Sequence, residues 1–299
     1  MVSTMKKTKT ILITGANKGI GFAIVKAVLE QFPETHLFFS CRDKHRSVAA
    51  INSLTSIVPG SESRLDAVIM DVSNRDSIQS AASQIEYLLS QKGLKLYGIV
   101  NNAGIMNSPT GVEDVVRVNT LGPKYVLDYF YHLLEPDIGR VVNVTSAAGP
   151  NYLSRCNDRT RKILTHREVT WEQILELTEE FIRQYQESSD SEKELLNSNV
   201  YGFSKACTNA LTMQQARSHT TIKINSCTPG FIETDMTLPI AQNQGKSPQE
   251  MGMKAPAEGT RSCIHLLMND VTTGHYFGSD CVRSPIDRYR APGTPAFNG

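Results

Sequence analysis

Short apolar runs alternate with longer amphipathic segments along nearly the whole chain, and this alternation constrains the fold more than any other feature. Most of the runs are apolar on both faces, as in parallel sheets that helices cover on both sides. The alternation predicts an α/β protein with a single doubly wound Rossmann-type domain and a mostly parallel seven-stranded sheet. The strands are expected at 10–14, 36–41, 67–71, 97–101, 141–145, 222–227 and 275–277. The helices are expected at 20–31, 44–57, 75–90, 112–134, 200–217 and 256–268.

One segment, residues 151–199, interrupts this alternation before the helix expected at 200. Thr170 followed by Gln173 fits a capping box. Apolar residues then recur at helical spacing at Ile174, Leu177, Phe181 and Tyr185. We expect a helical insertion that docks on the domain, with a disordered linker as the alternative and a loop at 188–199. The predicted boundaries are a flexible N-terminus at 1–9, the catalytic domain at 10–285 and a C-terminal tail at 286–299.

Composition narrows the range of partners. Hydrophobic residues make up 40% of the 299 residues and charged residues 20%, which is an ordinary globular balance. The net charge of +1 argues against nucleic acid or an anionic membrane as a partner. Nothing resembles a membrane span or a signal peptide, so a cytoplasmic protein is expected. The six cysteines form no Cys-x-x-Cys pair and the seven histidines show no ligand spacing, so we expect free thiols and no metal.

A glycine-rich loop follows the first expected strand and opens a helix, with the sequence Thr-Gly-Ala-Asn-Lys-Gly-Ile-Gly at residues 14–21. Gly15 would make the tight turn, Gly19 would let the backbone approach a phosphate, and Gly21 would allow close packing. The helix N-terminus would present N–H groups and a partial positive charge to a pyrophosphate. The spacing departs from Gly-x-Gly-x-x-Gly, and by itself the loop is equally consistent with a turn that binds nothing.

The choice of cofactor depends on the end of the second strand. An NAD site usually has an acid there, whereas this chain has Arg42. Arg42 and Lys18 together suit a dianionic 2′-phosphate, which predicts NADPH over NADH. The alternative is that both are solvated surface charges. Asp43 leaves a question open, since it would either pair with Arg42 or bind ribose itself.

Two more strand ends carry candidate contacts. Asp71, followed by Val72, would meet an adenine amino group or else cap the next helix. Asn102, Ala103 and Gly104 follow the fourth strand, where small residues let the backbone approach the adenosine. Taken alone, this stretch is only a turn signal.

Three side chains suggest proton transfer to a carbonyl. Tyr201 and Lys205 are four residues apart and share a helix face. A phenol has a reference pKa of about 10, which a nearby ammonium, an oriented hydroxyl and the positive charge of an oxidised nicotinamide would lower. Ser146 ends the fifth strand, and ligands bind at strand ends in such sheets. Taken alone, Tyr201 and Lys205 would be an ordinary half-buried helical pair. Ser146 alone would be a helix or turn cap.

Taken together and in this order, these motifs resemble the short-chain dehydrogenase/reductase family. The resemblance extends from about residue 10 to 280 and rests on the glycine loop, Asp71-Val72, Asn101 to Gly104, Asn119, Ser146, Tyr201-x-x-x-Lys205 and Pro229-Gly230. The insertion before the tyrosine, with Arg42 and Lys18, is similar to the monomeric NADPH-dependent carbonyl reductase subgroup.

The resemblance implies a catalytic role for four residues. Tyr201 would be the general acid, Lys205 would lower its pKa and hold the nicotinamide ribose, and Ser146 would bind the substrate carbonyl. Asn119 would position a water that links Lys205 to solvent. The serine is preceded by Thr145, and the assignment fails if Thr145 is the residue that faces the substrate.

The resemblance also completes the cofactor site. The backbone of Ile232 and the hydroxyl of Thr234, beyond Pro229 and Gly230, would hold the nicotinamide carboxamide. The full expected set is Gly15, Asn17, Lys18, Gly19, Ile20, Gly21, Arg42, Asp71, Val72, Asn102, Ala103, Gly104, Tyr201, Lys205, Pro229, Gly230, Ile232 and Thr234.

The implied activity is NADPH-dependent reduction of ketones, aldehydes or quinones. Met236, Leu238, Pro239 and Ile240 suggest an apolar lid, which favours substrates with hydrophobic bodies. Alternatives are a dedicated reductase for a pteridine, terpenoid or alkaloid ketone, and an NADPH-sensing protein without catalysis. The insertion would cover the surface through which most relatives oligomerise, so a monomer is expected.

Overall fold

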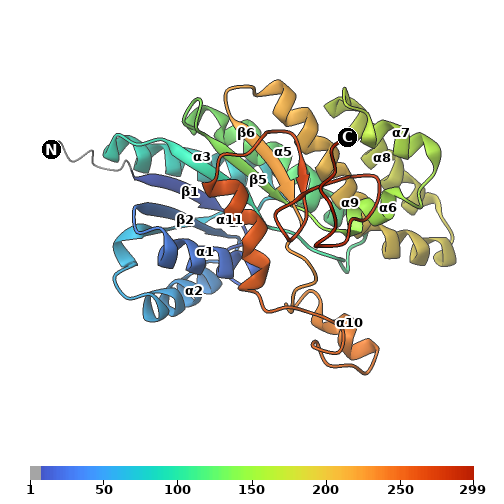
Figure 1. The fold of residues 1–299 in the computed structure, drawn as a ribbon, viewed down its shortest axis with the longest axis horizontal. Coiled ribbons are helices and arrows are strands. Elements are labelled where there is room, and N and C mark those ends of the chain that lie inside the picture. The colour runs from blue at the N-terminus through green and yellow to red at the C-terminus, as the bar shows by residue number, and fades with distance from the viewer. Residues whose placement is uncertain (1–7) are drawn as a thin grey trace.

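The computed structural model describes residues 8–299 and has an eight-stranded sheet at its centre (Figure 1). The strand order is β3-β2-β1-β4-β5-β6-β7-β8, and every neighbouring pair is parallel except β7 and β8. This confirms the doubly wound architecture. The strands are β1 (Lys9–Ile13), β2 (Thr35–Cys41), β3 (Leu65–Ile69), β4 (Leu96–Asn101), β5 (Arg140–Val144), β6 (Lys223–Cys227), β7 (Tyr276–Phe277) and β8 (Arg283–Ser284).

The sheet has one strand more than the seven expected. β8 has only two residues and pairs antiparallel with β7, so it offers too few positions for a detectable alternation. At the other end of the chain, residues 1–7 of the expected flexible N-terminus lie outside the described residues, and Lys9 already belongs to β1.

Helices cover both faces of the sheet (Figure 1). Both faces of the sheet are apolar, because successive side chains of β1 point to opposite sides. Ile11 and Ile13 are buried in one hydrophobic core and Leu12 is buried in the other. The first core includes α1 (Gly19–Gln31), α2 (Lys44–Ile57) and α11 (Arg261–Met268). The second includes α3 (Arg75–Lys92), α5 (Gly122–Phe130) and the end of α9 (Asp190–Ser218). Short 3₁₀ turns lie at η1 (Glu62–Arg64) and η4 (Glu258–Thr260).

The segment expected as one helix at 112–134 is interrupted. It consists of α4 (Val112–Val116), a π-helical turn η2 (Arg117–Leu121), α5 and a 3₁₀ turn η3 (Tyr131–Leu133). Asn119 lies in the π-helical turn, and its carbonyl accepts a 2.7 Å hydrogen bond from the Thr208 hydroxyl of α9. The prediction of a single regular helix was wrong because this long-range bond stabilises a local change of pitch.

The insertion is helical, as expected, but its end is not a loop. It contains α6 (Ala148–Leu153), α7 (Asp158–Thr165) and α8 (Trp171–Glu187). The capping box at the start of α8 is confirmed, since Thr170 and Gln173 bond to each other's backbone N–H at 3.3 and 3.0 Å. The loop predicted at 188–199 was wrong, because Glu192 accepts a hydrogen bond from the Ser189 N–H at 2.9 Å and α9 begins at Asp190.

The apolar stripe of α8 packs inside the molecule. Ile174, Leu177 and Phe181 are buried in a third core with α4 and α9, and the Phe181 ring stacks on Phe203 with 4.3 Å between centroids. The disordered-linker alternative is therefore wrong. A short helix, α10 (Leu238–Asn243), projects away from the sheet in Figure 1. Within residues 8–299, no helix is both long and apolar enough to cross a bilayer.

Candidate active site

The main cleft is a cavity of about 910 Å³ at the carboxyl ends of the strands. It is lined by the glycine loop, the ends of β2, β3 and β4, the middle of α9 and the segment after β6. β1 and β4 are neighbours at the point where the strand order reverses, which is where such sheets bind dinucleotides. The expected cofactor residues that line it are Gly15, Asn17, Lys18, Gly19, Ile20, Gly21, Arg42, Asp71, Val72, Asn102, Ala103, Gly104, Tyr201, Lys205, Pro229 and Thr234.

The glycine loop has little room for side chains. Gly15 has a φ of +62°, and a Cβ there would lie 2.8 Å from the Ala103 Cα. A Cβ on Gly21 would overlap the Gly15 carbonyl oxygen and the Asn102 amide nitrogen. The Asn102 amide donates hydrogen bonds to the carbonyls of Thr14 and Gly15 at 2.9 and 3.2 Å. Asn102 thus ties the glycine loop to the end of β4.

The N-terminus of α1 is open to an anion. Its N-cap residue is Lys18, whose side chain makes no cap hydrogen bond, so the first N–H groups of the helix are not capped by a side chain. Uncapped N–H groups at a helix N-terminus form an anion site. The Lys18 ammonium bonds to Asp235 at 2.8 Å, and both residues line the cleft.

The end of β2 is strongly basic. Asp43 caps α2 by accepting a 2.9 Å hydrogen bond from the Arg46 N–H, and this bond lowers the pKa of the Asp43 carboxyl. Arg42 and Arg46 both line the cleft. These two guanidinium groups and the uncapped helix fit a dinucleotide with an extra phosphate. Arg46 was not predicted from the sequence as a phosphate-binding residue, although it lies one helical turn after Arg42.

Asp71 does not cap the following helix. Its carboxylate accepts hydrogen bonds from the Ser73 N–H and hydroxyl at 2.9 and 2.6 Å, while Asn74 caps α3 through the Ser77 N–H at 3.0 Å. The helix-cap alternative is therefore wrong, and Asp71 keeps its place in the wall of the cleft.

Lys205 lies deep in the cleft and is only 5% exposed. Its ammonium donates a 3.0 Å hydrogen bond to the Val144 carbonyl. A Cβ on Gly104 would lie 3.3 Å from the Lys205 Nζ and 3.2 Å from the Asn119 Oδ1, so only a small residue fits between them. Burial lowers the pKa of Lys205 to about 8.

Tyr201 is half-buried, and the Lys205 Nζ lies 5.7 Å from its ring centroid. Burial raises the pKa of Tyr201, and a hydrogen bond with Ser146 acts in the opposite direction. The lowered phenol pKa expected from the sequence is not what the polypeptide alone produces. The reason is that desolvation disfavours the phenolate more than the Ser146 hydroxyl stabilises it.

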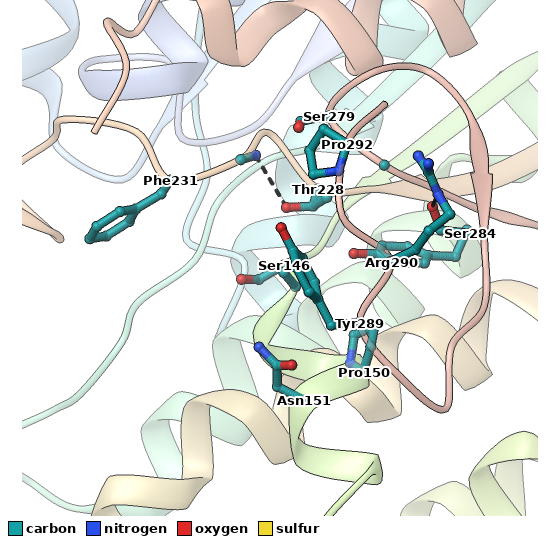
Figure 2. Close-up of a pocket in the computed structure, with 14 residues that line it drawn as sticks. Ser146, Pro150, Asn151, Thr228, Phe231, Ser279, Ser284, Tyr289, Arg290 and Pro292 are labelled. Carbon is teal, nitrogen blue, oxygen red and sulfur yellow. Dashed lines mark hydrogen bonds between the residues drawn. The ribbon is translucent and has the colours of Figure 1, made fainter. Parts of the chain in front are cut away.

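Ser146 opens onto a smaller cavity, the side pocket, of about 280 Å³ (Figure 2). Its hydroxyl accepts a 3.1 Å hydrogen bond from the Ala148 N–H. Thr145 is 2% exposed and its hydroxyl donates to the Cys227 carbonyl at 3.2 Å. Ser146 is therefore the more exposed of the two residues, and its hydroxyl acts to lower the pKa of Tyr201. Thr145 nevertheless lines the main cleft, whereas Ser146 lines the side pocket.

Four expected site residues lie outside the lining of the main cleft, and Ser146 on the side pocket is one of them. Asn119 sits behind Lys205, and its amide bonds to the Ile105 backbone at 2.8 and 2.9 Å and to the Ser204 hydroxyl at 3.0 Å. Gly230 lines the side pocket instead. Ile232 is 2% exposed and lines neither cavity.

Residues of the C-terminal segment also line the side pocket, where no motif had pointed to them: Tyr289, Arg290 and Pro292. Met236, Leu238, Pro239 and Ile240, expected as an apolar lid, line the main cleft.

The chain is similar to known proteins in sequence and in fold. The short chain dehydrogenase family model matches residues 9–156. Carbonyl reductase (NADPH) 1 of Sus scrofa is 31% identical over 83% of this chain and 86% of its own length. The (+)-neomenthol dehydrogenase of Arabidopsis thaliana is 29% identical over 86% of this chain and 90% of its own. The structure of salutaridine reductase from Papaver somniferum superimposes with a TM-score of 0.73 at 23% identity, covering 90% of this chain and 99% of that one.

A doubly wound sheet with a glycine loop at its switch point and a tyrosine–lysine pair beside it defines a dinucleotide-dependent oxidoreductase. The protein belongs to the short-chain dehydrogenase/reductase family.

Proposed function

We propose that the protein reduces ketones, aldehydes or quinones to alcohols or hydroquinones, with NADPH as the hydride donor. The observation that carries this proposal is the position of Tyr201 and Lys205 in the wall of the same cavity as the glycine loop. Bound NADPH would supply a hydride to the carbonyl carbon, and the chain would supply the proton for the oxygen.

Tyr201 acts as the proton donor. A phenol has an ordinary pKa of about 10, so the group holds a proton at neutral pH that it can give to the substrate oxygen as the hydride arrives. Ser146, whose hydroxyl acts to lower the pKa of the same phenol, donates to the carbonyl oxygen and holds it near Tyr201. Lys205 stabilises the phenolate that remains after proton transfer and holds the nicotinamide ribose.

The remaining assignments follow the cleft. Arg42 and Arg46 bind the 2′-phosphate, which gives the preference for NADPH. Asn119 lies next to Lys205 and helps to supply it with protons through water. The nicotinamide carboxamide is held beyond Pro229 and Gly230 by the backbone of Ile232 and the hydroxyl of Thr234.

The direct test is oxidation of NADPH by the purified protein with menadione as acceptor, followed by the loss of NADPH absorbance and repeated with NADH. The expected result is turnover with NADPH and much lower catalytic efficiency with NADH. Equal efficiency with both cofactors would remove the 2′-phosphate assignment. An absence of turnover with every carbonyl compound offered would remove the enzymatic assignment.

A second candidate is a dedicated reductase for one terpenoid or alkaloid ketone. The relative that is (+)-neomenthol dehydrogenase, 29% identical, favours it. A panel of unrelated quinones, diketones and cyclic ketones separates the two, because broad turnover supports the general reductase and a single strong substrate supports the dedicated enzyme. An NADPH sensor without catalysis would bind the cofactor and oxidise none of it. The monomeric state and cytoplasmic location of the protein remain predictions.

A further inference from the structure

The C-terminal strap, residues 286–299, folds back onto the body of the protein (Figure 1). Three of its residues, Tyr289, Arg290 and Pro292, form part of the wall of the side pocket. Ser146 lies in the same wall. The strap therefore borders the place where the proposed reaction puts the substrate.

A largely buried ion pair holds the strap in place. The Arg290 side chain is 7% exposed and pairs with Asp280, whose side chain is 16% exposed. Arg290 also donates to the Ser284 hydroxyl at 2.8 Å and to the Thr294 carbonyl at 2.6 Å, and Asp280 accepts from the Gly293 N–H at 2.9 Å. The ion pair and the bond to Ser284 tie the strap to the β7–β8 region, so the strap forms part of the pocket wall.

The side pocket presents polar groups that the protein does not itself use. Within residues 8–299, the side chains of Asn151, Ser279 and Tyr289 make no hydrogen bond, although all three line the pocket. Tyr289 is 53% exposed. Figure 2 shows its hydroxyl end directed toward Thr228, whereas the ring of Phe231 points away from the other labelled side chains.

We infer that the side pocket receives the body of the substrate and that Tyr289 is a specificity-determining residue, which selects carbonyl compounds with a hydrogen-bonding group close to the reacting carbonyl. The inference rests on the proposed function, because Ser146 is what places the carbonyl at this pocket. It differs from the hydrophobic substrate bodies that the apolar lid residues suggested. A site built to hydrogen-bond a substrate hydroxyl discriminates against an analogue that lacks it.

The test compares hydroxyacetone with butanone, in which a methyl group replaces the hydroxyl. The quantity measured is the ratio of their kcat/KM values with NADPH, in the wild type, in Tyr289→Phe and in the control Tyr87→Phe, whose side chain is exposed on α3. Loss of one hydrogen bond predicts that Tyr289→Phe lowers the hydroxyacetone-to-butanone ratio of kcat/KM about 3- to 10-fold. Tyr87→Phe should keep the wild-type ratio. The intrinsic reactivity of hydroxyacetone cancels, since only the change in the ratio is used.

A binding measurement separates failure of this inference from failure of the proposed function. The rise in unfolding temperature that each ketone causes is measured on the NADP⁺-loaded protein, which requires no turnover. A larger rise with hydroxyacetone that Tyr289→Phe abolishes supports the pocket assignment even if no carbonyl is reduced. An unchanged kcat/KM ratio in Tyr289→Phe overturns the inference about Tyr289. If neither ketone is turned over, the inference is overturned when hydroxyacetone raises the unfolding temperature equally in the wild type and in Tyr289→Phe.

Discussion

Lys205 donates a 3.0 Å hydrogen bond from its ammonium to the carbonyl of Val144, and this bond ties the centre of α9 to the end of β5. The same two elements carry Tyr201 and, just past the strand, Ser146. This contact therefore helps to fix the spacing between Tyr201 and Ser146. The helix that bears Lys205 starts in the insertion, so packing of the insertion also supports the site.

Tyr201→Phe should abolish most turnover and leave NADPH binding intact, because phenylalanine keeps the ring and loses the transferable proton. Removal of a general acid predicts a decrease in kcat of about 10²- to 10⁴-fold. Steady-state kinetics with menadione and NADPH binding by fluorescence measure the two effects. Activity close to that of the wild type would mean that another group delivers the proton.

The free energy of unfolding should depend on pH through Lys205 in the cofactor-free protein. Its folded pKa is lowered to about 8 from the ordinary value of 10.5, so between these pH values the unfolded chain binds more protons. Stability from this group therefore rises with pH across that window, by a total on the order of 3 kcal/mol. Urea unfolding at a series of pH values, compared with Lys205→Met, measures the difference. Parallel profiles for the two proteins would contradict the prediction.

Arg42→Ala and Arg46→Ala should each weaken NADPH and spare NADH, because both guanidinium groups line the cleft where the 2′-phosphate is proposed. Loss of a charge-assisted hydrogen bond predicts a KM for NADPH about 10- to 100-fold higher. Lys26→Ala is the control, since Lys26 pairs with Glu30 on α1 and does not line the cleft. Equal losses with both cofactors would point to a structural role for the arginines.

Phe181→Ala should destabilise the protein by about 3–5 kcal/mol, because a buried aromatic ring stacked on Phe203 would be replaced by a cavity. Leu195→Ala, in the same insertion at a position 63% exposed, should change stability by less than about 0.5 kcal/mol. Chemical denaturation of both variants tests the docking of the insertion. Similar small effects would mean that α8 contributes little to the stability of the domain.

The protein should be a monomer in solution. The apolar stripe of α8, formed by Ile174, Leu177 and Phe181, is buried inside the molecule and is therefore not exposed to a second copy. The mass measured by light scattering at micromolar concentration checks this. A dimer or tetramer would show that some other surface mediates assembly.

Much of the fold and of the site was predictable because it depends on local demands. Neighbouring residues determine three of these features: the period of each strand, the steric need for glycine at Gly15 and Gly21, and the placement of Tyr201 and Lys205 on one helix face. These same local patterns place the glycine loop straight after the first strand.

Other features were decided by contacts between distant segments. The break at Asn119 depends on Thr208, and the seating of the C-terminal strap depends on the pairing of Arg290 with Asp280. The pKa of Tyr201 is a further case, since the expected lowering ignored burial that only the packed structure creates. The sequence by itself determined the sheet, the glycine loop and the reactive side chains, because periodicity and backbone sterics act over a few residues. The tertiary structure alone decided which walls enclose the substrate and how strongly each group is desolvated, because both depend on segments far apart in the chain.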